Sequence, residues 1–236
     1  MLTYLNDPAL KAAFLDQLTR HEQHDQFIKG TYGQMNGRFR GCGVGCSLHS
    51  LNVLQGKTGE GVMARTGDHT RYETELGIPI WLAYLEDHLF ETLTDEESAT
   101  WPRRFAEAIP VGVTIPDRVR AQILRWMLAA ETFGVRYATD APEVIAAIDQ
   151  IAALFDREIA GDAPTAAEWN EADARAAWDA RAAWAARAAW DAWAAWDARA
   201  AWDEPHHNAA KAAAFSTALS RYVLEAVRAL AGTGSS

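Results

Sequence analysis

Apolar side chains recur every three or four residues along most of the chain, and this spacing predicts amphipathic helices. Asp7 and Pro8 suit the N-cap and the first turn of a helix, and Leu10 and Phe14 follow at helical spacing. We therefore expect a first helix that begins at Pro8 and ends near Phe27.

Proline and glycine separate later segments that show the same spacing. They predict helices over residues 80–93, 101–108, 117–130 and 142–159, and a final helix after Pro205. Few segments alternate apolar and polar residues as strands do. The predicted fold class is therefore mainly α.

Glycine interrupts the helical spacing between Lys29 and Asp68. Within this stretch, the segment SLHSLNVL predicts a short helix that begins at Cys46 or Ser47. The sequence thus indicates an irregular, Gly-rich loop region on a helical core.

An alanine-rich repeat of the hexad R-A-A-W-D-A follows, with tryptophans six residues apart at Trp178, Trp184, Trp190, Trp196 and Trp202. Alanine and Arg–Asp pairs four residues apart favour a long Ala/Trp/Arg-rich helical element. Six residues turn a helix by about 240°, so these tryptophans reach three faces of it. Such apolar faces predict a homo-oligomer.

Two other interpretations of the repeat remain open. In the first interpretation, the repeat is a structural filler of variable length. In the second, its tryptophan and arginine side chains form a stacking surface for bases. The acidic character of the chain argues against base stacking. For domains, we expect a helical core at 1–160 with a pocket region at 29–75, the repeat helix at 161–204, and a C-terminal helix at 205–236 that packs on the core.

Composition narrows the class of protein. Hydrophobic residues make up 49% and charged residues 23%, as in globular proteins. The formal charge of −10 argues against general nucleic-acid binding and against an anionic membrane surface. The first residues lack the pattern of a signal peptide, so we expect a cytoplasmic protein whose Cys42 and Cys46 stay as thiols.

The segment GRFRGCGVGCSLHSLN suits an anion site. Lys29, Arg38 and Arg40 stand around glycine-rich backbone that precedes the expected short helix, whose first N–H groups bind anions. Tyr32 and Phe39 offer rings that stack on a base. The alternative is a tight turn with solvated arginines.

The same segment also suits a cysteine nucleophile. Cys46 follows Gly45 at the expected helix start, where a thiol pKa falls. His49 or His69 would be the general base, oriented in the second case by a nearby acid. The alternative is a buried, inert pair of cysteines.

A zinc site is the third possibility. Cys42, Cys46, His49 and His69 are suitable ligands, yet the glycines between the cysteines disfavour the single helix that would align them. We therefore expect no metal and no other cofactor. The segment HEQHD, residues 21–25, resembles a ligand cluster and is interpreted as an exposed helix face.

Three segments, FIKGTYG, GCGVGCSLHS and HTRYETELGIPIWLAYLED, resemble a family of small proteins from phages and other mobile elements. That family has a K-G-x-Y stretch, a G-C-x-V-G-C-x-x-H motif, an E-L-G-I-P helix and an Ala/Trp/Arg-rich tail. The resemblance covers roughly residues 27–105. Its motif positions are Lys29, Gly30, Tyr32, Cys42, Cys46, His49, His69, Tyr72 and Glu73.

The resemblance and the local basic cluster together imply a phage-type anti-defence protein that sequesters a small anionic, nucleotide-like signalling molecule. The expected ligand-binding residues are Lys29, Tyr32, Arg38, Arg40, Cys42, Arg71 and Tyr72. One alternative is a hydrolase or transferase that uses Cys46 with His49 or His69. Another is a protein-inhibitor module that acts through a helical surface.

Overall fold

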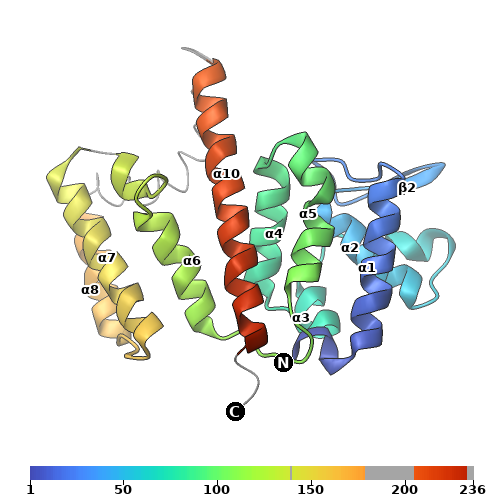
Figure 1. The fold of residues 1–236 in the computed structure, drawn as a ribbon, viewed down its shortest axis with the longest axis horizontal. Helices are drawn as coiled ribbons and strands as arrows, with labels where there is room; N and C mark the ends of the chain where they lie inside the picture. Colours follow the sequence, from blue (N-terminus) through green and yellow to red (C-terminus); the bar gives the residue numbers. More distant parts are fainter. Residues whose placement is uncertain (139, 179–204, 233–236) are drawn as a thin grey trace. The chain divides into compact units, whose positions relative to one another are not determined.

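The computed structural model describes residues 1–138, 140–178 and 205–232, and these residues are mainly helical, which confirms the expected fold class (Figure 1). The chain forms two compact units. Unit 1 contains Met1–Ile115 and the residues from Val223 onward, and unit 2 contains Pro116–Tyr222. Most of the tryptophan repeat, and with it the expected three-faced helix, lies outside the described residues.

Unit 1 is built from short helices and one small hairpin. Its elements are η1 (Thr3–Asn6), α1 (Pro8–Gln23), β1 (Gln34–Asn36), β2 (Arg38–Arg40), α2 (Gly43–Leu54), η2 (Gly59–Met63), α3 (Thr70–Leu76), α4 (Ile80–Thr92), α5 (Asp95–Ala108), the end of α10 (Pro205–Arg228) and η4 (Ala229–Gly232). Helix α2 packs against α1, α4 and α5. Apolar side chains from these helices, such as Leu18, Leu48, Leu82 and Trp101, are fully buried between them.

Local chemistry determines where the helices begin and end. The Asp7 carboxylate accepts a hydrogen bond from the Ala9 N–H at 2.8 Å and caps α1, as expected. The helix ends at Gln23, earlier than predicted, because Asp25 takes a left-handed conformation with a φ of 51°.

Two helices begin at residues other than those predicted. Helix α2 begins at Gly43 rather than at Cys46 or Ser47, because the Cys42 sulfur accepts a hydrogen bond from the Gly45 N–H at 3.4 Å and acts as the N-cap. Helix α5 begins at Asp95, capped by Thr94, and continues through Pro102.

The hairpin of β1 and β2 is the only sheet in the described part of the chain, and its strands were not predicted. The strands are antiparallel and pair Met35 with Phe39, and Gly37 occupies the turn with a φ of 74°. Phe39 points into unit 1 and is 3% exposed, whereas Arg38 is exposed.

Unit 2 contains α6 (Asp117–Ala129), η3 (Val135–Ala138), α7 (Pro142–Ala160), α8 (Ala166–Trp178) and α10 as far as Tyr222. Val144 and Ile148 of α7 form a buried cluster with Leu128 and Val135 around it. Trp126 stacks on Tyr222 with ring centroids 5.3 Å apart. None of the described helices combines the length and the apolar character needed to span a bilayer.

Candidate functional site

The candidate catalytic and ligand-binding residues from the sequence all lie in unit 1, and several of them gather in two groups along α2. One group surrounds the N-terminus of α2. The other surrounds His49, seven residues and therefore roughly 10 Å further along the helix axis. The remaining candidates have structural partners elsewhere in the unit.

The first group centres on Asp87 of α4. Its Oδ2 accepts hydrogen bonds from the Tyr32 hydroxyl and from His69 Nε2, each at 3.0 Å, and the Cys42 sulfur lies within 4.8 Å of this carboxylate. Glu91 lies one helical turn further along α4. We call Tyr32, Cys42, His69, Asp87 and Glu91 the Asp87 cluster.

Glycines allow the segments of the Asp87 cluster to approach one another closely. A Cβ atom on Gly45 would overlap the carbonyl oxygen of Tyr32, and one on Gly67 would lie 3.0 Å from the Tyr32 ring. The loop that carries Tyr32 therefore packs directly on the first turn of α2. His69 Nδ1 lies 3.2 Å from the Gly67 carbonyl oxygen, which fixes the orientation of the imidazole.

Beneath the cluster lie two polar side chains that are fully buried. The Tyr72 hydroxyl donates to Glu86 Oε2 at 3.3 Å, and Glu86 Oε1 has no hydrogen-bond partner among the described residues. Burial raises the pKa of the Glu86 carboxyl well above its usual range. Tyr72 thus belongs to the interior next to the cluster rather than to an open pocket.

The protonation of the cluster follows from burial and charge. Burial raises the pKa of the Cys42 thiol, and the negative charge of Asp87 raises it further. Burial and Asp87 together raise the pKa of Tyr32 to about 12. Both groups are therefore neutral hydrogen-bond donors at neutral pH.

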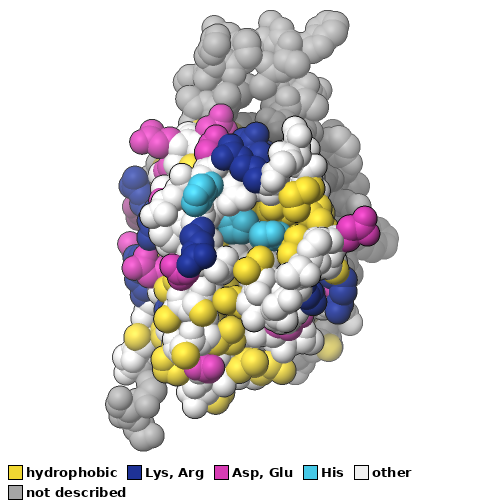
Figure 2. All heavy atoms as spheres, turned by 90° about the vertical axis from the view of Figure 1, so that its right-hand side faces the viewer, with side chains coloured by type: hydrophobic (Ala, Val, Ile, Leu, Met, Phe, Trp, Pro, Cys, Tyr) yellow, Lys and Arg dark blue, Asp and Glu magenta, His cyan; other side chains and the backbone are white. Residues whose placement is uncertain are grey.

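The second group lines an open pocket of about 290 Å³, which we call the histidine pocket. It contains no acidic side chain; its lining residues are Gln17, Arg20, His21, His24, Gln26, Arg38 and His49. Figure 2 shows the corresponding face of the molecule, where histidine side chains lie between lysine and arginine side chains. Helix α1, helix α2 and the β2 strand supply most of these residues.

A pair of imidazoles forms the inner wall of the histidine pocket. His49 Nδ1 lies 3.2 Å from His21 Nε2, and the His49 ring stacks on Phe39 with centroids 4.0 Å apart. Burial lowers the pKa of His49 to about 4. Burial and the neighbouring His49 lower the pKa of His21 to about 3, so both rings are neutral at neutral pH.

The basic residues of the glycine-rich region differ in what they contact. Lys29 Nζ donates to the Leu93 carbonyl oxygen at 2.6 Å and pairs with Asp95 at 3.0 Å. Arg40 lies 3.8 Å from Asp25. Arg38, in contrast, makes no ion pair with any described residue and lines the histidine pocket. Of these three cations, Arg38 is thus the one without an ion pair among the described residues, and it faces the histidine pocket.

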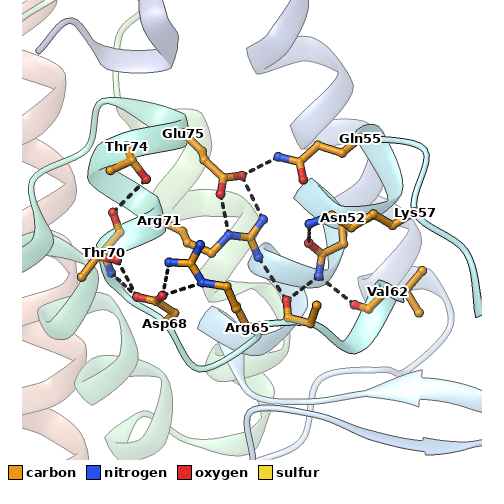
Figure 3. Close-up of polar contacts among 11 residues, drawn as sticks. Asn52, Gln55, Lys57, Val62, Arg65, Asp68, Thr70, Arg71, Thr74 and Glu75 are labelled. Carbon is orange, nitrogen blue, oxygen red and sulfur yellow. Dashed lines mark hydrogen bonds and ion pairs between the residues drawn. The ribbon is translucent and has the colours of Figure 1, made fainter. Parts of the chain in front are cut away.

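Arg71 has a structural role (Figure 3). Its buried guanidinium forms two hydrogen bonds with Glu75, at 2.6 and 2.9 Å, and a third contact with the Ala64 carbonyl oxygen at 3.4 Å. Asn52 of α2 donates to the same carbonyl oxygen at 2.8 Å. Arg71 and Asn52 therefore tie the loop after η2 to α3 and α2.

Cys46 is fully buried, and its thiol donates to the Gly41 carbonyl oxygen at 3.4 Å. Burial raises its pKa, which opposes formation of the nucleophilic thiolate. Neither His49 nor His69 is among its hydrogen-bond partners in the described part of the chain. The four zinc ligands suggested by the sequence do not form one site, because Cys46 bonds to the Gly41 carbonyl oxygen and His49 contacts His21.

Sequence reasoning missed several residues of both groups: Gln17, Arg20, His21, His24, Gln26, Glu86, Asp87 and Glu91. The interpretation of residues 21–25 as an exposed face was wrong for His21, which is only 3% exposed. A signal was present, because His21 follows Phe14 and Leu18 on the apolar face of α1. Asp87 and Glu91 share one face of a helix, but nothing local indicated that Cys42 lies opposite them.

No protein-family model, curated protein or solved structure matches the chain. The resemblance to the phage family therefore stays a prediction from the motif residues. Several of these residues lie close together around the Asp87 cluster: Gly30, Tyr32, Cys42, His69 and Tyr72.

Proposed function

We propose that the protein binds and sequesters a small anionic, nucleotide-like molecule in the histidine pocket. The observation that carries this proposal is the lining of that pocket. In a chain with a net charge of −10, it presents arginine, histidine and glutamine side chains and no carboxylate. We further propose, from the motif resemblance, that the protein acts against host defence in the cytoplasm of a phage-infected cell.

The lining offers the contacts that such a ligand needs. Arg38 has the planar set of donors that binds a phosphate through two parallel hydrogen bonds. Gln17 and Gln26 supply amides that both donate and accept, which suits a sugar or a base edge. The volume of about 290 Å³ lies at the lower end of ligand pockets, so a mononucleotide fits better than a longer ligand.

Binding without turnover is the better supported of the two chemistries. Cysteine catalysis requires a thiol within hydrogen-bond reach of a histidine. Cys46 instead bonds to backbone carbonyl oxygens, and burial raises its pKa. Sequestration requires only affinity and sufficient protein.

Calorimetric titration of the full chain with a panel of linear and cyclic nucleotides tests the proposal. We expect one class to bind, and Arg38→Ala to weaken binding about tenfold or more, as loss of a charged hydrogen bond does. Arg118→Ala is the matched control, because Arg118 is exposed on α6 and does not line the pocket. Absence of binding, or equal losses in both variants, would contradict the proposal.

Chromatography of the compounds released by heating distinguishes sequestration from catalysis. Recovery of the intact nucleotide supports sequestration. A new product that disappears in Cys46→Ala would instead support the enzyme.

We also propose that the full chain forms a homo-oligomer through the tryptophan repeat. The support comes from the sequence, because tryptophans on three faces of a helix leave apolar surface for other copies to cover. Light scattering is expected to give a mass that is a multiple of 26.0 kDa at micromolar concentration. A monomer would contradict this proposal.

A further inference from the structure

Three potential metal ligands meet at the N-terminus of α2. The Cys42 sulfur and one carboxylate oxygen each from Asp87 and Glu91 lie within 4.8 Å of one another. Asp87 and Glu91 are four residues apart and so share one face of α4, and Cys42 approaches them as the N-cap of α2. A tetrahedral ion with metal–sulfur and metal–oxygen bonds of about 2.0–2.3 Å holds its ligand atoms roughly 3.3–3.8 Å apart, so small side-chain rotations would bring the three atoms onto one common ion.

The two carboxylates are already held in position. Tyr32 and His69 both bond to Oδ2 of Asp87, which leaves its Oδ1 for another contact. The Gly30 N–H lies 3.1 and 3.0 Å from the two oxygens of Glu91. Such outer hydrogen bonds are typical of carboxylates that bind metal ions.

A second observation points to a cation at this place. Glu86 is fully buried, and its Oε1 has no hydrogen-bond partner among the described residues. That oxygen is directed at the first turn of α2, because a Cβ on Gly43, next to Cys42, would lie only 2.5 Å from it. A buried acceptor without a donor is costly, and a cation held next to the first turn of α2 would reduce that cost.

We propose that Cys42, Asp87 and Glu91 bind one divalent transition-metal ion of the zinc and cobalt class. The thiolate selects such an ion over magnesium or calcium, which prefer oxygen ligands throughout. On binding, the Cys42 thiol releases its proton to solvent and the sulfur lone pair forms the metal bond. Three protein ligands leave a fourth position for water.

The proposed metal site is separate from the histidine pocket, on which the proposed function rests. It lies at the start of α2, whereas the histidine pocket surrounds His49 further along the helix. Either proposal can therefore fail while the other holds.

Titration of the chelator-treated full chain with Co²⁺ tests the site. We expect one bound ion per chain and a near-ultraviolet band from thiolate-to-cobalt charge transfer, which Zn²⁺ then abolishes by displacement. A wild-type chain that binds no Co²⁺, or binds it without the thiolate band, would overturn the proposal.

Variants assign the ligands. Cys42→Ser is expected to lose the thiolate band, and serine keeps a helix-capping oxygen so that α2 is retained. Cys46→Ser is the matched control and should keep the band. Glu91→Gln and Asp87→Asn should each weaken Co²⁺ binding at least about tenfold, since changes outside the ligand shell alone cost 10–100-fold. A band that survives Cys42→Ser but disappears in Cys46→Ser would also overturn the proposal.

The last variant tests the outer hydrogen bonds. His69→Gln should weaken Co²⁺ binding roughly tenfold while the thiolate band persists, because His69 orients Asp87 without contacting the ion. Circular dichroism of each variant shows whether its helices have formed. If His69→Gln removed the thiolate band in a folded chain, the assignment of ligands would be wrong.

Discussion

Gly45 shows how a single residue controls the structure of the candidate site. Replacement with alanine would place a methyl group against the Tyr32 carbonyl oxygen, which is backbone and cannot turn aside. We expect Gly45→Ala to lower the free energy of unfolding by about 1–3 kcal/mol, as overpacking does. Urea denaturation measures this, and Gly61→Ala is the control because its nearest neighbour would be 3.5 Å away. Equal effects would contradict the close approach.

His21 predicts how stability depends on pH. Its pKa is about 3 in the folded chain and 6.5 in the unfolded one, so between these values the unfolded chain binds more protons. Stability should therefore fall as the pH drops below about 6.5, and His21 alone accounts for about 2 kcal/mol at pH 5. The titratable and charged groups that line the pocket around His21 are His49, His24, Arg20 and Arg38, and the first two lower the pKa of His21 in addition to burial.

Denaturation at pH 8 and at pH 5 measures this loss. His21→Gln removes the titrating group, so the variant should lose less stability between the two pH values than the wild type does. Losses of the same size in both proteins would show that His21 is not responsible.

Among the elements, α3 depends on one ion pair. Arg71 is 1% exposed and holds Glu75 with two hydrogen bonds, while its third contact reaches the loop after η2. Arg71→Ala leaves Glu75 without its charged partner and with the hydrogen bond from Gln55. It should lower the free energy of unfolding by about 3 kcal/mol, at the lower end for buried pairs because Glu75 is partly exposed. Arg71→Lys keeps the positive charge but loses the planar guanidinium that makes two hydrogen bonds, so its loss of unfolding free energy should lie between those of the wild type and Arg71→Ala.

Hydrogen exchange locates the effect of Arg71→Ala. Amides of residues 57–76 should lose protection first, because Arg71 joins that loop to α3. Uniform loss throughout unit 1 would show that the ion pair is not a local tie.

The sequence predicted helix starts correctly where a capping residue or a proline determines them. Asp7 with Pro8, and Pro79 before Ile80, lie at helix starts as expected. The predicted start of α5 was wrong because Pro102, which lies inside the helix, resembles a residue of a first helical turn. The predicted start of α2 was wrong because Cys42 is the N-cap, and cysteine is not among the preferred N-cap residues.

The candidate site was predictable only in part, because its geometry depends on contacts between segments far apart in the sequence. Tyr32, Cys42 and His69 were identified by residue type and motif. Asp87 was not identified, because its role depends on the tertiary packing that brings Tyr32, Cys42 and His69 against α4. Arg71 was placed in the pocket for its charge, and only the structure shows that Glu75 already neutralises it.

At the scale of the whole molecule, each unit has its own buried core. Leu82 is buried in unit 1 and Ile148 in unit 2. Leu82→Ala and Ile148→Ala should each cost about 2–5 kcal/mol. Hydrogen exchange should show the loss of protection mainly in the unit that carries the substitution, and equal losses in both units would show that they unfold together.

The burial of both thiols has a practical use. Maleimides react with exposed thiolates, and Cys42 and Cys46 are 1% and 0% exposed with raised pKa values, so the native chain should take up such reagents slowly. A cysteine introduced at Asn36, on the exposed hairpin next to Arg38, should then be labelled selectively without removal of the natural cysteines. A fluorophore attached there would report when the neighbouring histidine pocket fills, and slow labelling of the native thiols would time the opening of α2.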